Sequence, residues 1–215
     1  MKLPLVYPLT DTKISGLSHA DQVAKLAEAC ATFVQLREKN LSARDFFNDA
    51  KAAAAVARDA GVTLIINDRV DVALALSASG IHLGVHLGQD DLPPEAARKL
   101  LGNKAIVGYS THNVLQASAA ANLPVDYIAI GPIFDTGTKT NPDPVVGLDG
   151  LRAVRNAVGS IPLVAIGGIT LENAAAVIEA GADSVALISA LLSGGEAELS
   201  VRYRTFTSIL ADRQT

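Results

Sequence analysis

Short apolar runs alternate with segments of helical period along the whole chain. A near-continuous apolar run is typical of a strand that is buried on both faces of a parallel sheet, and the segments between the runs are typical of packing helices. The pattern predicts eight repeats of a strand followed by a helix. The expected strands cover residues 3–7, 32–36, 63–67, a run within 80–87, 106–110, 127–131, 162–166 and 184–188.

The clearest predicted helices have recognisable ends. They cover residues 42–60, 93–101 and 170–180. Gly61 and Gly181 directly follow two of them, where a helix commonly ends in a left-handed residue. Because no residues remain for another domain, the pattern favours one closed (β/α)₈ TIM barrel over residues 1–215. An open doubly wound sheet is the alternative, although no G-x-G-x-x-G turn follows the first strand.

Composition narrows the class of protein. The chain is 49% hydrophobic but only 4% aromatic, so we expect a core of Ala, Val, Ile and Leu. A net charge of −4 provides no basic surface for nucleic acid, which is therefore not an expected partner. The chain shows neither a spanning apolar stretch nor the pattern of a secretory signal, so we expect a cytoplasmic protein without a membrane partner.

The chain contains a single cysteine, Cys30, which excludes an internal disulfide. It lies in an Ala-rich segment at a helix end, without an evident basic neighbour that would lower its pKa. We therefore expect a buried structural thiol rather than a nucleophile.

Polar residues follow the predicted strands at the edge where α/β folds bind their ligands. Gln35, Arg37 and Lys39 alternate at the end of the second strand, so they should share one side. Two cations and an amide suit a polyanion such as a diphosphate. A solvated loop of mixed charge is the alternative.

The third strand ends in Asn67 and Asp68, directly after an apolar run. Asp68 is either the cap of the next helix or an oxygen ligand for Mg²⁺, which typically binds one or two carboxylates together with phosphate oxygens and waters. A second carboxylate facing Asp68 would complete the metal site. Asp90 and Asp91 both qualify, and the sequence does not decide between them.

The fourth repeat contains a doubled motif, HLG-V-HLG, at residues 82–88. His82 and His86 are four residues apart, but Gly84 between them argues against a helix that would bring both to one face. We therefore do not expect zinc binding. The doubling leaves open which copy forms the end of the strand.

Hydroxyl groups and glycines follow the last four strands. Ser110 either caps the following helix or donates a hydrogen bond to a phosphate group. Residues 126–139 form a predicted buried strand and a loop of hydroxyls that ends in Lys139. Gly168, Ile188 and Ser189 belong to the two loops that frequently form a phosphate site in (β/α)₈ barrels. These positions predict a phosphorylated ligand.

Six segments, QLREK, IINDRVDVAL, HLGQDD, GYSTH, IGPIFDTGTK and AIGGIT, resemble the thiamine phosphate synthase family in its order over almost the whole chain. The resemblance implies a (β/α)₈ catalytic domain and a transferase. Such an enzyme couples 4-amino-5-hydroxymethyl-2-methylpyrimidine diphosphate to a 4-methyl-5-(2-phosphoethyl)thiazole, or its carboxylated form, and releases diphosphate with the help of Mg²⁺. The implied route is dissociative: the bond to diphosphate breaks first, and the thiazole nitrogen then captures the pyrimidine cation.

The resemblance also implies a role for each candidate residue. Two acids, Asp68 and Asp91, would bind Mg²⁺. The pyrimidine diphosphate would be bound by Gln35, Arg37, Lys39, Asn67, Ser110 and Lys139, of which Arg37, Ser110 and Lys139 would be catalytic. The thiazole phosphate would be bound by Thr136, Gly137, Thr138, Gly168, Ile188 and Ser189.

Two features depart from the family pattern. The HLG doubling lengthens the spacing between Asp68 and Asp91, and Asp135 places an acid in a loop expected to bind anions unless it forms an Asx-turn. The rivals are a thiazole tautomerase, in which we expect a histidine in place of Pro132, a phosphate-binding isomerase, and a ligand sensor without activity. Asp68 and Lys139 favour the synthase. The expected partners are small phosphorylated substrates, and a homo-oligomer is compatible with the sequence.

Overall fold

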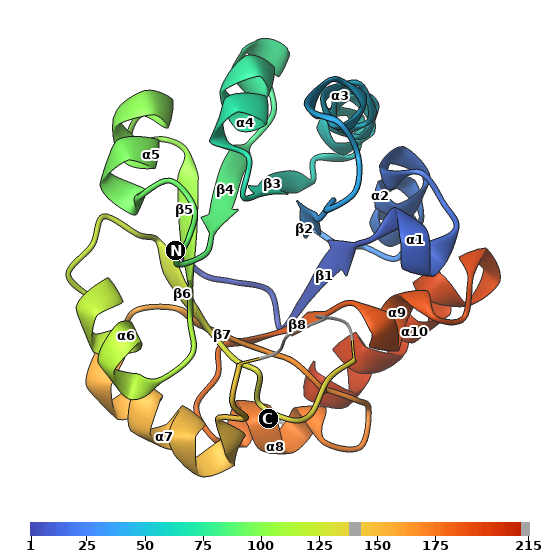
Figure 1. Cartoon of the computed structure of the whole chain (residues 1–215). Helices are drawn as coiled ribbons and strands as arrows, with labels where there is room; N and C mark the ends of the chain where they lie inside the picture. Colours follow the sequence, from blue (N-terminus) through green and yellow to red (C-terminus); the bar gives the residue numbers. More distant parts are fainter. Residues whose placement is uncertain (138–142, 212–215) are drawn as a thin grey trace.

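Eight parallel strands form one closed barrel in the order of the chain, because β8 pairs with β1 as well as with β7. The computed structural model describes residues 1–137 and 143–211. Helices surround the strands in a ring (Figure 1). The predicted (β/α)₈ barrel is therefore confirmed, and the open doubly wound sheet is wrong. The strands are β1 (Val6–Thr10), β2 (Phe33–Leu36), β3 (Thr63–Asn67), β4 (Leu83–Leu87), β5 (Ile106–Thr111), β6 (Tyr127–Ile130), β7 (Leu163–Ile166) and β8 (Ser184–Leu187).

The helices follow the strands in alternation, with local sequence signals at several ends. Ser42 caps one of them by accepting a hydrogen bond from the backbone N–H of Asp45, and Gly61 ends the same helix in the left-handed conformation. The helical elements are α1 (Thr12–Ser15), α2 (His19–Glu28), α3 (Ala43–Ala60), α4 (Val70–Leu76), the 3₁₀ turn η1 (Ser77–Ser79), α5 (Pro94–Leu101), α6 (Val114–Ala120), α7 (Gly147–Val158), α8 (Ala174–Glu179), α9 (Ser189–Leu192) and α10 (Glu196–Ala211).

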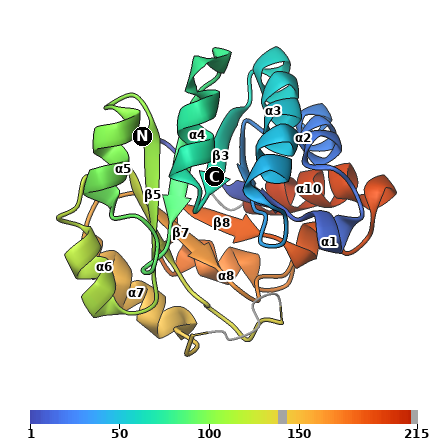
Figure 2. The same cartoon turned by 45° about the horizontal axis from the view of Figure 1, so that its top comes forward.

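The ring of helices closes where α10 packs beside α2 (Figure 2). The Ser200 hydroxyl donates a hydrogen bond to the carbonyl of Lys25 at 2.8 Å, and the Arg204 guanidinium donates one to the carbonyl of Glu28, also at 2.8 Å. The last helix thus binds carbonyls in the last turn of α2, where the Lys25 carbonyl also accepts from the backbone N–H of Ala29. Within the described ranges, no helix combines the length and the apolar character that crossing a membrane requires.

The side chains of the strands form two separate layers. Outward positions such as Val34 and Leu36 pack against the helices in a core that is mostly aliphatic, as predicted, and that also contains Phe46, Tyr203 and Phe206. The inside of the barrel differs from that prediction, because Tyr7, Phe33 and Tyr127 form an aromatic cluster with ring centroids 4.8 to 6.4 Å apart. Few aromatic residues are present in the sequence, and three of them are concentrated at this place.

Two predicted element boundaries and the predicted burial of Cys30 are wrong. The first strand begins at Val6 rather than residue 3, and Leu3 packs instead with the cluster inside the barrel. The predicted helix at residues 170–180 begins only at Ala174. Cys30 is exposed rather than buried, because the chain reverses direction after α2 and Cys30 occupies a left-handed position of that turn.

Candidate active site

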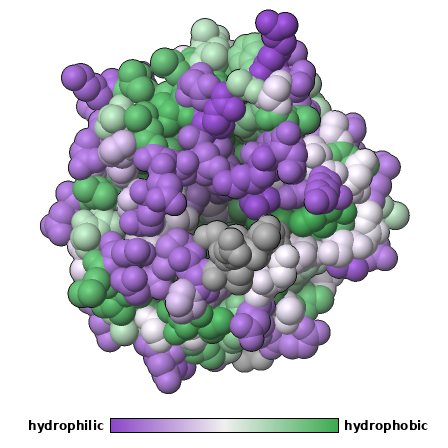
Figure 3. Space-filling model, in the orientation of Figure 1, coloured by the Kyte–Doolittle hydropathy of each residue, from purple (hydrophilic) through white to green (hydrophobic). Residues whose placement is uncertain are grey.

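A cavity of about 530 Å³ lies at the carboxyl ends of the barrel strands, and every strand contributes to its lining. This volume is within the usual range for small-molecule sites. Hydrophilic residues gather around the centre of this face of the barrel (Figure 3). The cavity brings together most of the candidate residues: Gln35, Arg37, Lys39, Asn67, Asp68, Asp91, Ser110, Thr136, Gly168, Ile188 and Ser189.

Among the described candidates, Gly137 alone is not part of this lining. Gly137 lines a smaller adjoining cavity of about 270 Å³, together with Thr136 and Asp135. Asp135 is exposed there and is not part of the lining of the main cavity. Thr138 and Lys139 lie outside the described residues.

The end of β2 presents its polar side chains to the cavity, as the alternation predicts. Gln35 is buried and its side-chain amide donates a hydrogen bond to the Tyr7 hydroxyl at 2.8 Å. The Arg37 guanidinium donates to Asp11 at 2.7 Å. The other oxygen of Asp11 accepts from the backbone N–H groups of Lys13 and Ile14, so the start of α1 fixes the acid that holds Arg37.

Asp68 is not a helix cap. The N-cap position of α4 is Arg69, which makes no capping bond with its side chain, and Asp68 instead pairs with Lys39. The backbone N–H of Asp68 donates to the carbonyl of His86 at 2.8 Å, which holds this residue at the junction of β3 and β4. Asp68 adopts a φ of 62°, a conformation that is uncommon outside glycine. The Asp68 side chain therefore has no capping role and lines the cavity instead.

The second copy of the doubled motif forms the end of β4, because His86 pairs in register with Asn67. This places Asp91 beside Asp68. The Asp91 carboxylate accepts a hydrogen bond from the backbone N–H of Gly88 at 2.7 Å. Burial, and secondarily the nearby charge of Asp68, raise the pKa of Asp91. Of the two acids that the sequence left open, Asp91 is the one that faces Asp68.

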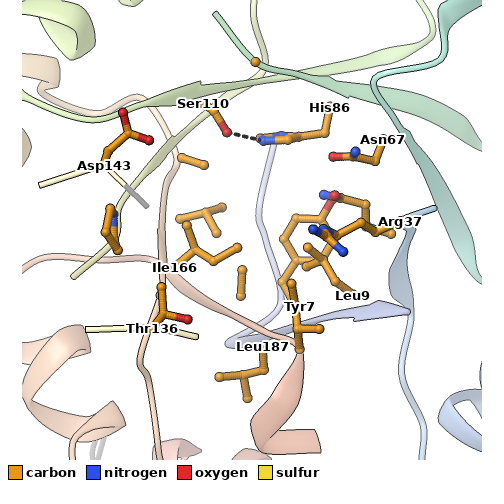
Figure 4. A pocket seen from close by; sticks show the side chains of 18 of the residues that line it. Tyr7, Leu9, Arg37, Asn67, His86, Ser110, Thr136, Asp143, Ile166 and Leu187 are labelled. Atoms are coloured by element: carbon orange, nitrogen blue, oxygen red, sulfur yellow. Dashed lines mark hydrogen bonds between the residues drawn. The ribbon is translucent and has the colours of Figure 1, made fainter. Parts of the chain in front are cut away.

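Ser110 is not the cap of α6 either, because the Asn113 side chain accepts from the backbone N–H of Gln116 at that end. The Ser110 hydroxyl instead lies 2.8 Å from Nε2 of His86 (Figure 4). Nδ1 of His86 lies 3.0 Å from the Tyr127 hydroxyl, and the two rings stack with centroids 5.5 Å apart. Burial lowers the pKa of His86 to about 4, so its ring is neutral at pH 7.

Sequence reasoning missed Tyr7 and His86, which line this cavity, and Tyr127, whose hydroxyl contacts both of them inside the barrel. The two tyrosines occupy apolar runs, which predict buried strands and no role in a site. Their alternation with outward residues such as Ile128 was the available signal, because it places both rings inside the barrel. His112 also lines the cavity, where Nδ1 donates to the carbonyl of Gly131 at 2.7 Å.

The loops after β6 and β7 form the opposite wall of the cavity. Gly167 and Gly168 adopt φ values of 99° and 65°, which favour glycine. A Cβ atom at Gly168 would lie 2.5 Å from the carbonyl oxygen of Asp135, so the two loops can approach only without a side chain there. Thr136 lies across the cavity from Arg37 (Figure 4), and Gly168 lines the same cavity.

Known proteins match this chain over nearly its whole length. The family model for thiamine monophosphate synthase matches residues 6–191, which include all six segments of the resemblance. The thiamine-phosphate synthase of Koribacter versatilis is 51% identical over 197 residues, covering 89% of this chain and 90% of that protein. That of Chloroflexus aurantiacus is 45% identical over 210 residues, covering 97% and 94%.

The fold is also that of a solved relative. A thiamine phosphate pyrophosphorylase from Pyrococcus furiosus superposes with a TM-score of 0.84 at 31% identity, covering 98% of this chain and 96% of that one. Together, the sequence matches and the shared barrel confirm the resemblance deduced from the motifs. This chain belongs to the thiamine monophosphate synthase family.

Proposed function

We propose that this protein is a transferase that couples a pyrimidine diphosphate to a thiazole phosphate, forming thiamine phosphate and releasing diphosphate. Family membership supports the reaction, and one observation about the cavity carries its assignment to this site. Lys39 pairs with Asp68, which lies beside Asp91, and Arg37 and Asn67 lie across the cavity from Thr136 (Figure 4). Gly168 and Ser189, which follow β7 and β8, line the same cavity. The cavity therefore offers separate places for two phosphorylated substrates.

Two buried polar atoms support the place of the pyrimidine diphosphate. Among the described residues, Oε1 of Gln35 and Nδ2 of Asn67 are buried without a hydrogen-bond partner. Buried polar atoms are normally paired, so these two are suited to a ligand. Oε1 of Gln35 can accept from the amino group of the pyrimidine, and Nδ2 of Asn67 can donate to a diphosphate oxygen.

The acids at the ends of β3 and β4 fit a magnesium ion. Mg²⁺ typically takes one or two protein carboxylates and fills its other positions with phosphate oxygens and waters. Asp68 and Asp91 supply two adjacent carboxylates, and in the part of the chain that the structure describes no third His, Cys, Asp or Glu joins them in a metal cage. When bound, Mg²⁺ would supply positive charge against the oxygens of the diphosphate.

The side chains around the pyrimidine diphosphate suit a dissociative reaction. Arg37, Lys39 and Lys139 would stabilise the negative charge that grows on the departing diphosphate, the kind of assistance that usually contributes most to such catalysis. The middle of the cavity is lined by small apolar side chains of β6, β7 and β8, including Ala129, Val164 and Ala186. They would limit the access of water to the pyrimidine cation until the thiazole nitrogen captures it.

The loops after β6, β7 and β8 would hold the thiazole phosphate. Thr136 and Ser189 bring hydroxyl groups to the cavity, and Gly168 leaves backbone atoms accessible beside them. Gly137, Thr138 and Ile188 complete the set proposed for this substrate. Pro132 lines the cavity at the position where a thiazole tautomerase is expected to carry histidine, which favours the synthase.

The test is to incubate the purified protein with both phosphorylated substrates, with and without Mg²⁺. We expect thiamine phosphate and diphosphate to form in equal amounts, and only with the metal. Product that forms equally well after exhaustive chelation would refute the metal assignment. A protein that yields no product at any Mg²⁺ concentration would refute the function itself.

A further inference from the structure

A continuous chain of side-chain hydrogen bonds crosses the inside of the barrel. The Gln35 amide lies 2.8 Å from the Tyr7 hydroxyl, and this hydroxyl lies 2.9 Å from that of Tyr127. The Tyr127 hydroxyl continues to Nδ1 of His86 at 3.0 Å, and Nε2 of His86 reaches Ser110 at 2.8 Å. The chain thus connects two residues of the proposed pyrimidine diphosphate site, Gln35 and Ser110, through three residues that were given no role.

The donors and acceptors determine the direction in which the hydrogen bonds of this series are donated. Nε2 of Gln35 can only donate, so the Tyr7 oxygen accepts from it. Within the described residues, the other partner of the Tyr7 hydroxyl is Tyr127, to which the single Tyr7 proton must go. The Tyr127 proton then goes to Nδ1 of His86. The remaining N–H of a neutral His86 is on Nε2 and donates to the oxygen of Ser110.

The opposite direction leaves buried donors unpaired. If Tyr127 donated to Tyr7, the Tyr7 proton would have no acceptor unless the Gln35 amide were turned over. The turned amide would then bury both of its N–H bonds without a partner among the described residues, where the present orientation leaves Oε1 and only one N–H bond unpaired. Unpaired buried N–H groups are rarer than unpaired carbonyl oxygens. A doubly protonated His86 would encounter the same problem, because it could not accept from Tyr127.

We propose that these five residues form a positioning chain that fixes His86 as its Nε2–H tautomer and directs the Ser110 proton into the cavity. Because Ser110 accepts from His86, its own proton is available to an anionic oxygen of the substrate. Tyr7, Tyr127 and His86 are positioning residues in this arrangement, and they act through Ser110. The proposal rests on the proposed function for the identity of that oxygen, whereas the tautomer does not depend on it.

The tautomer can be measured without substrate. In protein labelled with ¹⁵N at histidine, the two ring nitrogens of His86 report which one carries the proton, and His86→Gln identifies the signals. We expect protonated Nε2 and unprotonated Nδ1 at pH 7. A proton on Nδ1, or on both nitrogens, would reverse the direction of the chain and overturn the proposal.

A double-mutant cycle tests whether Tyr127 acts through Ser110. We expect Tyr127→Phe to lower kcat about tenfold, the effect of one lost hydrogen bond, and to change the KM for the thiazole phosphate less than about twofold. Ser110→Ala should lower kcat further, and adding Tyr127→Phe to it should have no additional effect. Independent, multiplicative effects of the two substitutions would overturn the proposal.

The matched control is Tyr203→Phe, which removes a hydroxyl from another buried tyrosine, on α10 and away from the cavity. We expect it to keep full activity. A wild-type protein that makes no thiamine phosphate would refute the proposed function. The measured tautomer of His86 would still show in which direction the hydrogen bonds run. An active protein whose folded Tyr127→Phe variant keeps full kcat would refute the positioning role alone.

Discussion

The ammonium group of Lys39 forms an ion pair with the carboxylate of Asp68, although the two residues are proposed to bind different partners. Lys39 is proposed to bind diphosphate and Asp68 to bind Mg²⁺. In the structure without ligands, the lysine offsets the negative charge where two acids face one another. Binding of the metal would therefore separate this pair and leave the lysine free for the diphosphate.

The first prediction concerns the two acids of the metal site. Asp68→Asn and Asp91→Asn should each weaken Mg²⁺ binding by about tenfold or more, because each removes a charged ligand. Calorimetric titration with Mg²⁺ alone, without substrates, measures the affinity. Asp90→Asn is the matched control, since Asp90 is the adjacent acid and also lines the cavity. An effect of Asp90→Asn as large as that of Asp91→Asn would contradict the assignment.

The second prediction concerns Lys39 and is an increase, not a decrease, in Mg²⁺ affinity. Lys39→Gln removes the cation that competes for Asp68, so Mg²⁺ should bind more tightly in the absence of substrate. The gain should be only about threefold, because the Lys39 side chain is half exposed and such pairs are weak. The same variant should raise the KM for the pyrimidine diphosphate. Weaker Mg²⁺ binding by this variant would show that Lys39 does not compete with the metal.

The sequence predicts which residues at the strand ends face the cavity better than it predicts which side chains they contact. Alternation placed Gln35 and Arg37 on the cavity side because the period of a strand is local. The contacts of Tyr7, His86 and Tyr127 join β1, β4 and β6, which only the closed barrel brings together. No local pattern encodes such a contact.

The local sequence also does not decide the role of a residue that suits both a helix cap and a ligand site. Asp68 and Ser110 both have the chemistry of a helix cap, and only the structure shows that other residues occupy the N-cap positions of α4 and α6. The Ala-rich neighbours of Cys30 predict a buried thiol at a helix end, whereas the thiol is exposed. The decisive feature there was the position of the turn, which sequence reasoning places only approximately.

The third prediction concerns the acid that holds Arg37. Asp11→Asn should raise the KM for the pyrimidine diphosphate about tenfold, because the charged partner of the guanidinium is lost. The KM for the thiazole phosphate should not change. Asparagine is also a good helix cap, so the free energy of unfolding in urea should stay within about 1 kcal/mol. Steady-state kinetics with each substrate varied in turn measure the two KM values.

The control for this variant is Asp45→Asn, which changes an exposed acid in the first turn of α3. It should leave both KM values unchanged. Equal increases in the two KM values for Asp11→Asn would indicate a general disturbance of the barrel and contradict a specific role through Arg37.

The fourth prediction concerns Lys139, which lies outside the described residues. Lys139→Ala should keep the fold and lower kcat roughly 100-fold, the usual cost of removing one group that stabilises developing charge. Steady-state release of diphosphate measures the rate, and circular dichroism checks the fold. Lys104→Ala is the control, because this exposed lysine precedes β5, at the end of the barrel away from the cavity. Full activity of Lys139→Ala would exclude the proposed role.

The fifth prediction concerns stability in acid. His19 is fully buried, with Nδ1 2.6 Å from the Thr10 hydroxyl, and burial lowers its pKa more than the charges of Asp49, Glu38 and Asp11 raise it. The unfolded chain therefore binds this proton more readily than the folded protein. As the pH falls below about 6.5, the ordinary pKa of histidine, the contribution of His19 to the free energy of unfolding should decrease.

Replacing His19 by glutamine removes this titration, so the free energy of unfolding should depend less steeply on pH below about 6.5. Urea unfolding at a series of pH values measures the slope for the wild type and the variant. His82→Gln, which removes an exposed imidazole, is the matched control. A steeper slope for His19→Gln than for the wild type would mean that the folded protein holds the proton more tightly, and that the three neighbouring acids outweigh burial.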